Sequence, residues 1–321
     1  MGGNALSFET RRVKRDEYFV LVDEIKEKLK NFGIEKFTDI PAYHTKPDFG
    51  DIDILIVSDR PNKDKWIREL FQPKEIYHNS NVFSFDYKDV QVDLIFTKLN
   101  DFQSSIDYFS YNDFGNLVGR LAHKRGLRFG HDGLSLSIRD DTQVIGEINL
   151  TKNIDEILSL LGYDPAPYHK GFDTLEDIFE YVVSSPYYTY EIFDLDNRNY
   201  RARTRDRKRK TYTEFLKWAE SRENGTYVYS GNKADYLPLV LHKFNKIDEY
   251  ASILKAHSIN LTIKEKFNGL IVRDLTGLDG KELGSFIAEF RKLFSKEDLL
   301  KMSKLMIQSE IENMYSKWES K

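Results

Sequence analysis

Two aspartates at the start of an apolar run offer the clearest chemistry in this sequence. Asp51 and Asp53 stand in Phe49-Gly50-Asp51-Ile52-Asp53-Ile54-Leu55-Ile56-Val57. Because side chains on a β-strand alternate between its faces, positions 51 and 53 would project from the same face. Two carboxylates held that close repel each other and resist ionisation. A hard divalent cation that prefers oxygen ligands, Mg²⁺ or Mn²⁺, removes this repulsion, so the spacing predicts a metal site.

A third aspartate fits the same site. Asp93 lies in the β-rich run Val90-Gln91-Val92-Asp93-Leu94-Ile95-Phe96, where Val92 and Leu94 would face the opposite side. If this strand pairs with the strand of Asp51 and Asp53, the three carboxylates form one cluster. Three acids around two metal ions suit in-line phosphoryl or nucleotidyl transfer, because one ion activates the attacking hydroxyl and the other holds the triphosphate. A lone Asp-x-Asp is often only a strand leaving a turn, so the prediction depends on the second strand.

These residues resemble a known family. Gly50-Asp51-Ile52-Asp53-Ile54-Leu55-Ile56, followed by Val92-Asp93-Leu94, looks like the DNA polymerase β-like nucleotidyltransferase superfamily. That superfamily includes CCA-adding enzymes, poly(A) polymerases and small-molecule nucleotidyltransferases. The resemblance covers roughly residues 15–135 and implies an α+β palm of mixed β-sheet with flanking helices. It also implies that Asp51 and Asp53 bind both metals, and that Asp93 binds the catalytic one and assists deprotonation of the attacking hydroxyl.

The sequence departs from the family where the triphosphate should bind. The family carries a Gly-Ser or Gly-Gly turn before the first Asp, and the stretch 40–49 has none. Thr45 and Lys46 offer a hydroxyl and an ammonium in its place. Alternatively, Gly2 and Gly3 fold back as a phosphate loop, since glycines let backbone N–H groups approach a phosphate; the other outcome is a frayed terminus. The opening Met1-Gly2-Gly3-Asn4-Ala5 is also similar to that of phage and large-virus proteins.

A predicted helix over residues 113–124 carries further phosphate-binding candidates. Asn116, Arg120 and His123 recur every three or four residues and would share one helix face. The helix N-terminus offers free N–H groups and Arg120 a bidentate donor, so we expect this face to contact a triphosphate or ribose. The alternative is a half-buried helix with ordinary polar residues.

Positive charge is concentrated in one segment of a slightly acidic chain. The net charge is −4, yet residues 198–210 hold eight Arg and Lys side chains and a single acid, Asp206. A strand would put the alternating arginines on one face, whereas a helix would scatter them. The predicted nucleic-acid contacts are Arg201, Arg203, Arg205, Arg207, Lys208, Arg209 and Lys210. Either a polyanion such as RNA or DNA binds here, or the segment is a solvated charged loop.

Composition limits the class of protein. The chain has 321 residues, of which 31% are charged and 40% hydrophobic, so it is a folded protein of two or three domains. The absence of cysteine excludes disulfides and Cys-ligated zinc and suits a reducing compartment. Neither a signal-peptide run nor a run of membrane-span length is present. We therefore expect a cytoplasmic protein with no membrane partner, in the host cytoplasm if the chain is viral.

Hydrophobic periodicity predicts the elements that position these residues. The expected helices are 15–31 and 62–71, and the expected strands are 36–43, 51–57, 81–87 and 90–96. The turn-rich stretch 162–167 predicts a catalytic palm domain at 1–162 and a mainly helical acceptor-binding region at 163–321, with a second break near 224. In that region Gly277 and Gly280 separate two predicted helices, either a helix-hairpin-helix that holds a nucleic-acid phosphate or a plain helical hairpin.

Together, these features predict a metal-dependent nucleotidyltransferase. The enzyme would move a nucleoside monophosphate from an NTP, with ATP among the candidates, to an acceptor hydroxyl and release pyrophosphate. The favoured acceptor is an RNA 3′ end, such as that of a tRNA. The alternatives are nucleotidylylation of a small molecule or protein, synthesis of oligonucleotide signals, and a nucleotide-binding regulator that lacks turnover because the Gly-Ser turn is missing.

Overall fold

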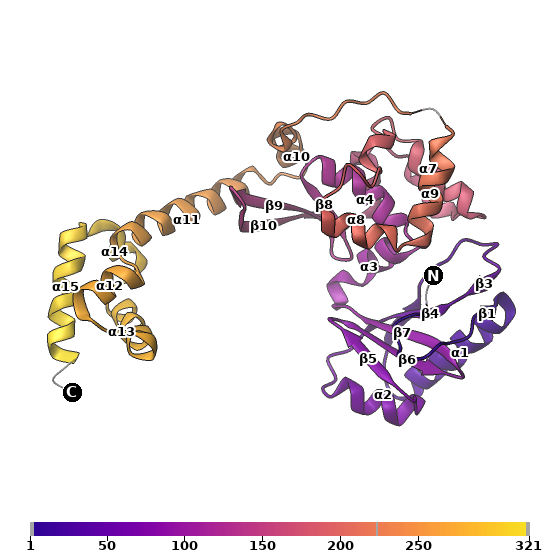
Figure 1. The fold of residues 1–321 in the computed structure, drawn as a ribbon, viewed down its shortest axis with the longest axis horizontal. Helices are drawn as coiled ribbons and strands as arrows, with labels where there is room; N and C mark the ends of the chain where they lie inside the picture. The colour runs from indigo at the N-terminus through magenta and orange to yellow at the C-terminus, as the bar shows by residue number, and fades with distance from the viewer. Residues whose placement is uncertain (1–2, 223, 319–321) are drawn as a thin grey trace. The chain divides into compact units, whose positions relative to one another are not determined.

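The chain divides into two compact units. The computed structural model describes residues 3–222 and 224–318. One unit comprises Met1–Ser137 and Glu147–Phe244, and the other comprises Ile138–Gly146 and Asn245–Lys321. Figure 1 shows a mixed sheet with helices at the N-terminal end of the chain and helices only at its C-terminal end. The α+β class with a mainly helical C-terminal region is therefore confirmed.

A five-stranded mixed sheet forms the core of the first unit. Its strands are β2 (Lys36–Asp39), β4 (Asp51–Val57), β5 (Ile76–Asn79), β6 (Val82–Tyr87) and β7 (Val90–Phe96), in the order β2-β4-β7-β6-β5. Strands β4 and β7 run parallel, and the other neighbours run antiparallel. β2 ends earlier than predicted, ahead of Pro41, which cannot donate to a strand ladder. β5 was not predicted, because this edge strand is largely exposed and carries no apolar alternation.

The two faces of the sheet have different roles. Ile52, Ile54 and Ile56 pack on one face against α1 (Arg15–Asn31) and α2 (Lys63–Phe71). Both helices lie on the same side of the sheet in Figure 1. The opposite face holds Leu55, which packs with side chains of α3 (Phe102–Phe109). Because strand residues alternate, Asp51 and Asp53 share this second face with Leu55.

The rest of the first unit is built around α4. A separate short pair is formed by β1 (Val13–Lys14) and β3 (Asp48–Phe49). The later elements are α4 (Phe114–Lys124), β8 (Leu127–Gly130), β9 (Gly133–Asp140), β10 (Gln143–Thr151), α5 (Ile154–Leu160), α6 (Pro165–Lys170), α7 (Leu175–Val183), α8 (Tyr200–Arg207), α9 (Lys210–Glu220) and α10 (Leu237–Lys243). Of β9 and β10, the segment Ile138–Gly146 belongs to the second unit. The ring of Phe114 in α4 lies 5.9 Å from the rings of both Phe172 and Tyr181. Residues 163–222 and 224–244 belong to the same compact unit as the sheet. The functional division into a palm domain at 1–162 and an acceptor-binding region at 163–321 stays a prediction.

The second unit has its own hydrophobic core. Its helices are α11 (Ile247–Lys266), α12 (Gly269–Thr276), α13 (Gly280–Leu293), α14 (Lys296–Lys301) and α15 (Lys304–Trp318). Phe267, Phe286 and Phe290 are buried together with aliphatic side chains of α12, α14 and α15. Gly277 ends α12 with a φ of 72°, and Asp279 caps α13. The two predicted helices around this turn are present; their contact with a nucleic acid stays a prediction. No helix among the described residues is both long and apolar enough to cross a bilayer.

We expect Phe290→Ala to destabilise the second unit alone. Phe290 is fully buried in that unit's core, and truncation of a buried Phe typically costs about 3–5 kcal/mol. Differential scanning calorimetry should show two transitions, one of which moves to lower temperature. Leu293→Ala is the matched control, because Leu293 lies on the same helix and is 65% exposed. A downward shift of both transitions would contradict separate cores.

Candidate active site

The register of the sheet brings three predicted aspartates together. Asp53 on β4 lies directly opposite Asp93 on the parallel strand β7, and Asp51 is two residues earlier on the same face. One carboxylate oxygen from each residue lies within 4.8 Å of the others. Among the described residues, no other three His, Cys, Asp or Glu side chains offer ligand atoms this close together. The geometry therefore supplies a set of hard oxygen donors of the kind that Mg²⁺ and Mn²⁺ prefer.

Electrostatics favours a cation at this cluster. Burial raises the pKa of Asp53 well above its ordinary value, and the charges of Asp51 and Asp93 raise it further. Burial also raises the pKa of Asp93 to about 6, and the charge of Asp51 adds to the effect. The pKa of Asp51 is raised by burial as well, although the positive charge of Lys46 opposes the shift. The fold thus holds three carboxylates where ionisation is unfavourable, and a divalent cation would relieve the repulsion.

Two polar neighbours orient Asp93. Gln91 is on the same face of β7, and its Nε2 donates to Asp93 Oδ1 at 2.9 Å. Ser84 on β6 lies opposite Asp93, and its hydrogen bond lowers the pKa of that carboxyl. Neither residue is predicted from the sequence. Gln91 could have been identified from the sequence, because it lies two positions from Asp93 in an otherwise apolar strand. Ser84 can be identified only once the register between β6 and β7 is known.

The N-terminal segment lies against the carboxylate strand. Gly3 has a φ of +88°, and a Cβ built on it would lie 2.4 Å from the carbonyl oxygen of Gly50. A backbone hydrogen bond from Gly3 lowers the pKa of Asp51, and the N–H of Ala5 donates to Gln91 Oε1 at 2.9 Å. A glycine is required at position 3 both for this close approach and for the positive φ. Gly2, the other half of the predicted phosphate loop, lies outside the described residues.

Thr45 and Lys46 are the predicted alternatives to that loop, and of these two residues Lys46 lies near the aspartates. The charges of Asp51 and Asp53 act on its ammonium group, while burial lowers its pKa. Its Nζ lies 3.3 Å from Asn112 Oδ1. Thr45 is exposed, and its hydroxyl donates to the backbone oxygen of Asp173 at 2.7 Å. The ammonium of Lys46 is therefore better placed for a triphosphate than the hydroxyl of Thr45.

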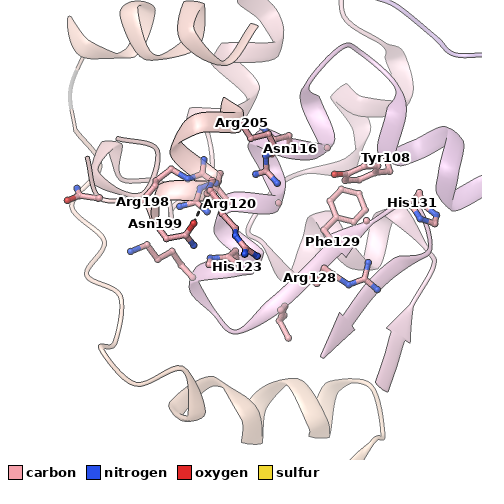
Figure 2. Close-up of a pocket in the computed structure, with 18 of the residues that line it drawn as sticks. Tyr108, Asn116, Arg120, His123, Arg128, Phe129, His131, Arg198, Asn199 and Arg205 are labelled. Atoms are coloured by element: carbon pink, nitrogen blue, oxygen red, sulfur yellow. Dashed lines mark hydrogen bonds between the residues drawn. The ribbon is translucent and has the colours of Figure 1, made fainter. Parts of the chain in front are cut away.

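The predicted helix face of α4 lines a separate pocket. Asn116, Arg120 and His123 lie together in the wall of a cavity of about 820 Å³, and none of the three aspartates lines it (Figure 2). Arg120 is buried, and its Nε and Nη2 donate to the backbone oxygen of Ile192 at 3.0 and 2.6 Å. Asp113 precedes the helix but forms no side-chain cap, because its carboxylate pairs with Arg209. The three side chains thus share a face, as expected, but line a cavity other than the carboxylate cluster.

The basic segment is helical, so its alternating arginines are scattered. Asp206 is fully buried and pairs with Arg198 and Arg205. Three more of the predicted contacts have acidic partners, in the pairs Arg203–Asp196, Arg209–Asp113 and Lys210–Glu214. Of the seven predicted nucleic-acid residues, Arg201 and Arg205 line the pocket of α4. Arg207 and Lys208 are exposed and line no part of it.

Comparisons with known proteins do not identify the family of this chain. Neither a protein-family model nor a curated protein matches the sequence. Among solved structures, polymerase beta of Leishmania infantum in a ternary P/T complex aligns at 14% identity and a TM-score of 0.34. The match covers 41% of this chain and 60% of that polymerase chain. A likeness this distant carries no functional argument of its own.

Removal of one repelling carboxylate should stabilise the metal-free protein. Asp93→Asn keeps an oxygen that accepts from Gln91 but removes one of three clustered charges. The raised pKa of Asp93, about 6, means that its ionisation above pH 6 opposes folding. In EDTA at pH 7.5 we therefore expect a higher melting temperature, by about 2–4 °C for each kcal/mol gained.

The same variant should lose the stabilisation that Mg²⁺ or Mn²⁺ confers on the native protein. Differential scanning fluorimetry with and without metal measures both effects. Asp39→Asn is the control, because Asp39 lies on the neighbouring strand β2 and pairs with Lys26 at 2.5 Å. A lower melting temperature in EDTA, together with an unchanged metal effect, would rule out the cluster as the metal site.

Proposed function

We propose that this chain is a metal-dependent nucleotidyltransferase of the DNA polymerase β-like superfamily. It would transfer a nucleoside monophosphate from an NTP to an acceptor hydroxyl and release pyrophosphate. The observation that carries the proposal is the register of Asp53 opposite Asp93, with Asp51 on the same face and one carboxylate oxygen of each residue within 4.8 Å of the others. The resemblance of Gly50–Ile56 and Val92–Leu94 to that superfamily supports it.

The aspartates have defined roles in this proposal. Asp51, Asp53 and Asp93 hold Mg²⁺ or Mn²⁺, which when bound neutralises phosphate charge and favours ionisation of the attacking hydroxyl. The family resemblance assigns to Asp93 the further role of accepting the proton of that hydroxyl. Gln91 holds the Asp93 carboxylate in place through its hydrogen bond to Oδ1. Such preorganisation keeps the donor atoms positioned before substrate arrives.

Lys46 and Gly3 replace the missing triphosphate turn in this proposal. The Lys46 ammonium lies in the field of Asp51 and Asp53, where a triphosphate held by metal would also lie. Gly3 keeps the N-terminal backbone close to Asp51, because any side chain there would collide with Gly50. Backbone amides and one ammonium would then hold the phosphates that a Gly-Ser turn holds in the family.

An RNA 3′ end is the acceptor that we favour. The support is the set of cations that line the α4 pocket, of which Arg201 has no ion pair with a described residue. A small-molecule acceptor would not require these cations. A protein acceptor with an acidic face and self-made oligonucleotides remain as outcomes of the experiment below.

The decisive experiment is a transfer assay. We expect that incubation with each labelled NTP, Mg²⁺ and total tRNA places label in RNA, and that Asp53→Asn lowers the rate by at least about a thousandfold, as loss of a charged catalytic group commonly does. Asp39→Asn, which leaves the cluster intact, should keep the native rate. Labelled product without added RNA would indicate oligonucleotide synthesis. Nucleotide binding without consumption of any NTP would contradict catalysis and indicate a regulator.

A second pair of variants tests the triphosphate assignment. Lys46→Ala removes the ammonium beside Asp51 and Asp53, so we expect kcat/KM for the NTP to fall by about ten- to a hundredfold, as loss of one charge-assisted phosphate contact should. Thr45→Ala alters the adjacent residue, whose hydroxyl is used on Asp173, and should leave kcat/KM within about threefold of native. Equal losses in the two variants would contradict the assignment.

A further inference from the structure

The pocket beside α4, called the basic pocket here, has a strongly one-sided charge. Among the described residues that line it are five arginines and two lysines, and none is Asp or Glu (Figure 2). We propose that the basic pocket binds a nucleoside phosphate, either free or at the end of a nucleic-acid strand. The site lies apart from the aspartate cluster and would exist whether or not that cluster transfers nucleotides.

The arginines around α8 carry more positive charge than their partners cancel. Arg198 and Arg205 share the single buried carboxylate of Asp206. Arg120 is buried beside them, but its hydrogen-bond partner is the neutral carbonyl of Ile192. Arg201 and Lys124 line the same cavity without an ion pair to any described residue. An uncompensated positive cluster in a partly enclosed cavity attracts an anion more strongly than the same charges on an open surface.

The geometry of Arg120 is suited to a phosphate. Its Nε and one N–H of Nη2 are held by the Ile192 oxygen, which fixes the plane of the guanidinium. The two N–H groups of Nη1 and the second of Nη2 remain for another acceptor, since guanidinium carries five donors. Two of these form an edge that can bind two phosphate oxygens at once. Burial and the charge of Arg198 lower the pKa of Arg120 only to about 10, so it stays charged at neutral pH.

Asn116 adds an unused donor to the same wall. Its Nδ2 is inaccessible to solvent and has no hydrogen-bond partner among the described residues. Asn116 precedes Arg120 by one helical turn, so both side chains point the same way (Figure 2). Buried donors are rarely left unpaired in proteins. A ligand oxygen placed between Asn116 and Arg120 would satisfy both groups.

The pKa of His123 reflects the same positive environment. Burial is the main cause that lowers its pKa to about 4, and the charges of Lys233, Arg120, Arg198 and Lys124 lower it further. The ring is therefore neutral at physiological pH, where it offers one donor and one acceptor. A neutral ring that can donate or accept suits a ribose hydroxyl or a base edge beside a phosphate.

The other side of the pocket is aromatic and nearly neutral. Tyr108 and Phe129 lie there with ring centroids 5.3 Å apart, and Figure 2 shows them away from Arg198 and Arg120. Arg128 on that side is neutralised by Asp132 and Glu147. Aromatic side chains supply flat surfaces for bases, and a volume of about 820 Å³ accommodates a mononucleotide. One charged and one aromatic end match a nucleoside phosphate better than inorganic phosphate.

Binding measurements on the metal-free protein test this site. The full-length Asp53→Asn protein in EDTA would be titrated calorimetrically with the four nucleoside 5′-monophosphates, the matching nucleosides and a 5′-phosphorylated tetranucleotide. We expect at least one phosphorylated probe to bind and its nucleoside to bind about tenfold more weakly or not at all. Tighter binding of the monophosphate would indicate that the ligand is a free nucleotide, and tighter binding of the tetranucleotide would indicate a strand end. Chelation and the Asp53 substitution make the result independent of nucleotidyl transfer.

Variants locate the binding within the pocket. Asn116→Asp replaces the unused donor with a carboxylate of equal size. It should lower the affinity for the phosphorylated probe by at least about tenfold. Arg201→Ala should weaken it about three- to tenfold, whereas Arg207→Ala is the control, because Arg207 lies exposed on the same helix but does not line the pocket. Unchanged melting temperatures would show that the variants fold. Equal effects of the two arginines, equal affinity for nucleosides, or no binding by any phosphorylated probe would each overturn the proposal.

Discussion

Parallel pairing of β4 with β7 is the constraint on which the candidate site depends. It sets Asp53 opposite Asp93 and leaves Asp51 on the same face, so three carboxylates meet where burial already disfavours their charge. On that face, hydrogen bonds from Gln91 and Ser84 and the charge of Lys46 offset this cost only in part. The opposite face supplies the stabilisation, because Ile52, Ile54 and Ile56 are fully buried against α1 and α2. A slip of one residue in register would move these isoleucines out of the core, so the hydrophobic face holds the acidic face in position.

The same sheet organises the surroundings of the cluster. Gln91 is the residue that links them, since it donates to Asp93 and accepts from the N–H of Ala5. The N-terminal segment is thereby joined to the carboxylate strands, and Gly3 completes the contact against Gly50. A segment that the family resemblance does not include thus lies against the strands that carry the aspartates. Lys46 lies in the connection between β2 and β3 and supplies the nearby positive charge.

The arrangement of the positive side chains depends on ion pairing. A buried charge requires a compensating partner, and the fully buried Asp206 has two in the first unit, the buried Arg198 and the exposed Arg205. The dense run at 198–210 is therefore partly structural, because several of its cations hold α8 and α9 against their neighbours. Arg198, Arg201 and Arg205, with Arg120 and Lys124 from α4, line a pocket whose described lining contains no carboxylate. The aspartate cluster and this basic pocket are therefore formed by separate groups of side chains.

The local hydrophobic pattern of the sequence determined where the strands and most of the helices lie in the chain. The alternation in 51–57 and 90–96 predicts β4 and β7 to the residue, and i,i+2 spacing alone places Asp51 and Asp53 on one face. The spacing of Asn116, Arg120 and His123 likewise predicts their shared helix face. Tertiary structure decided which strands pair, that Ser84 reaches Asp93, and that α4 faces α8 rather than the aspartates. It also decided that the basic run is mostly helical and that only part of its charge is neutralised. These outcomes depend on contacts between residues distant in the chain, such as Arg209 with Asp113, and no local periodicity carries that information.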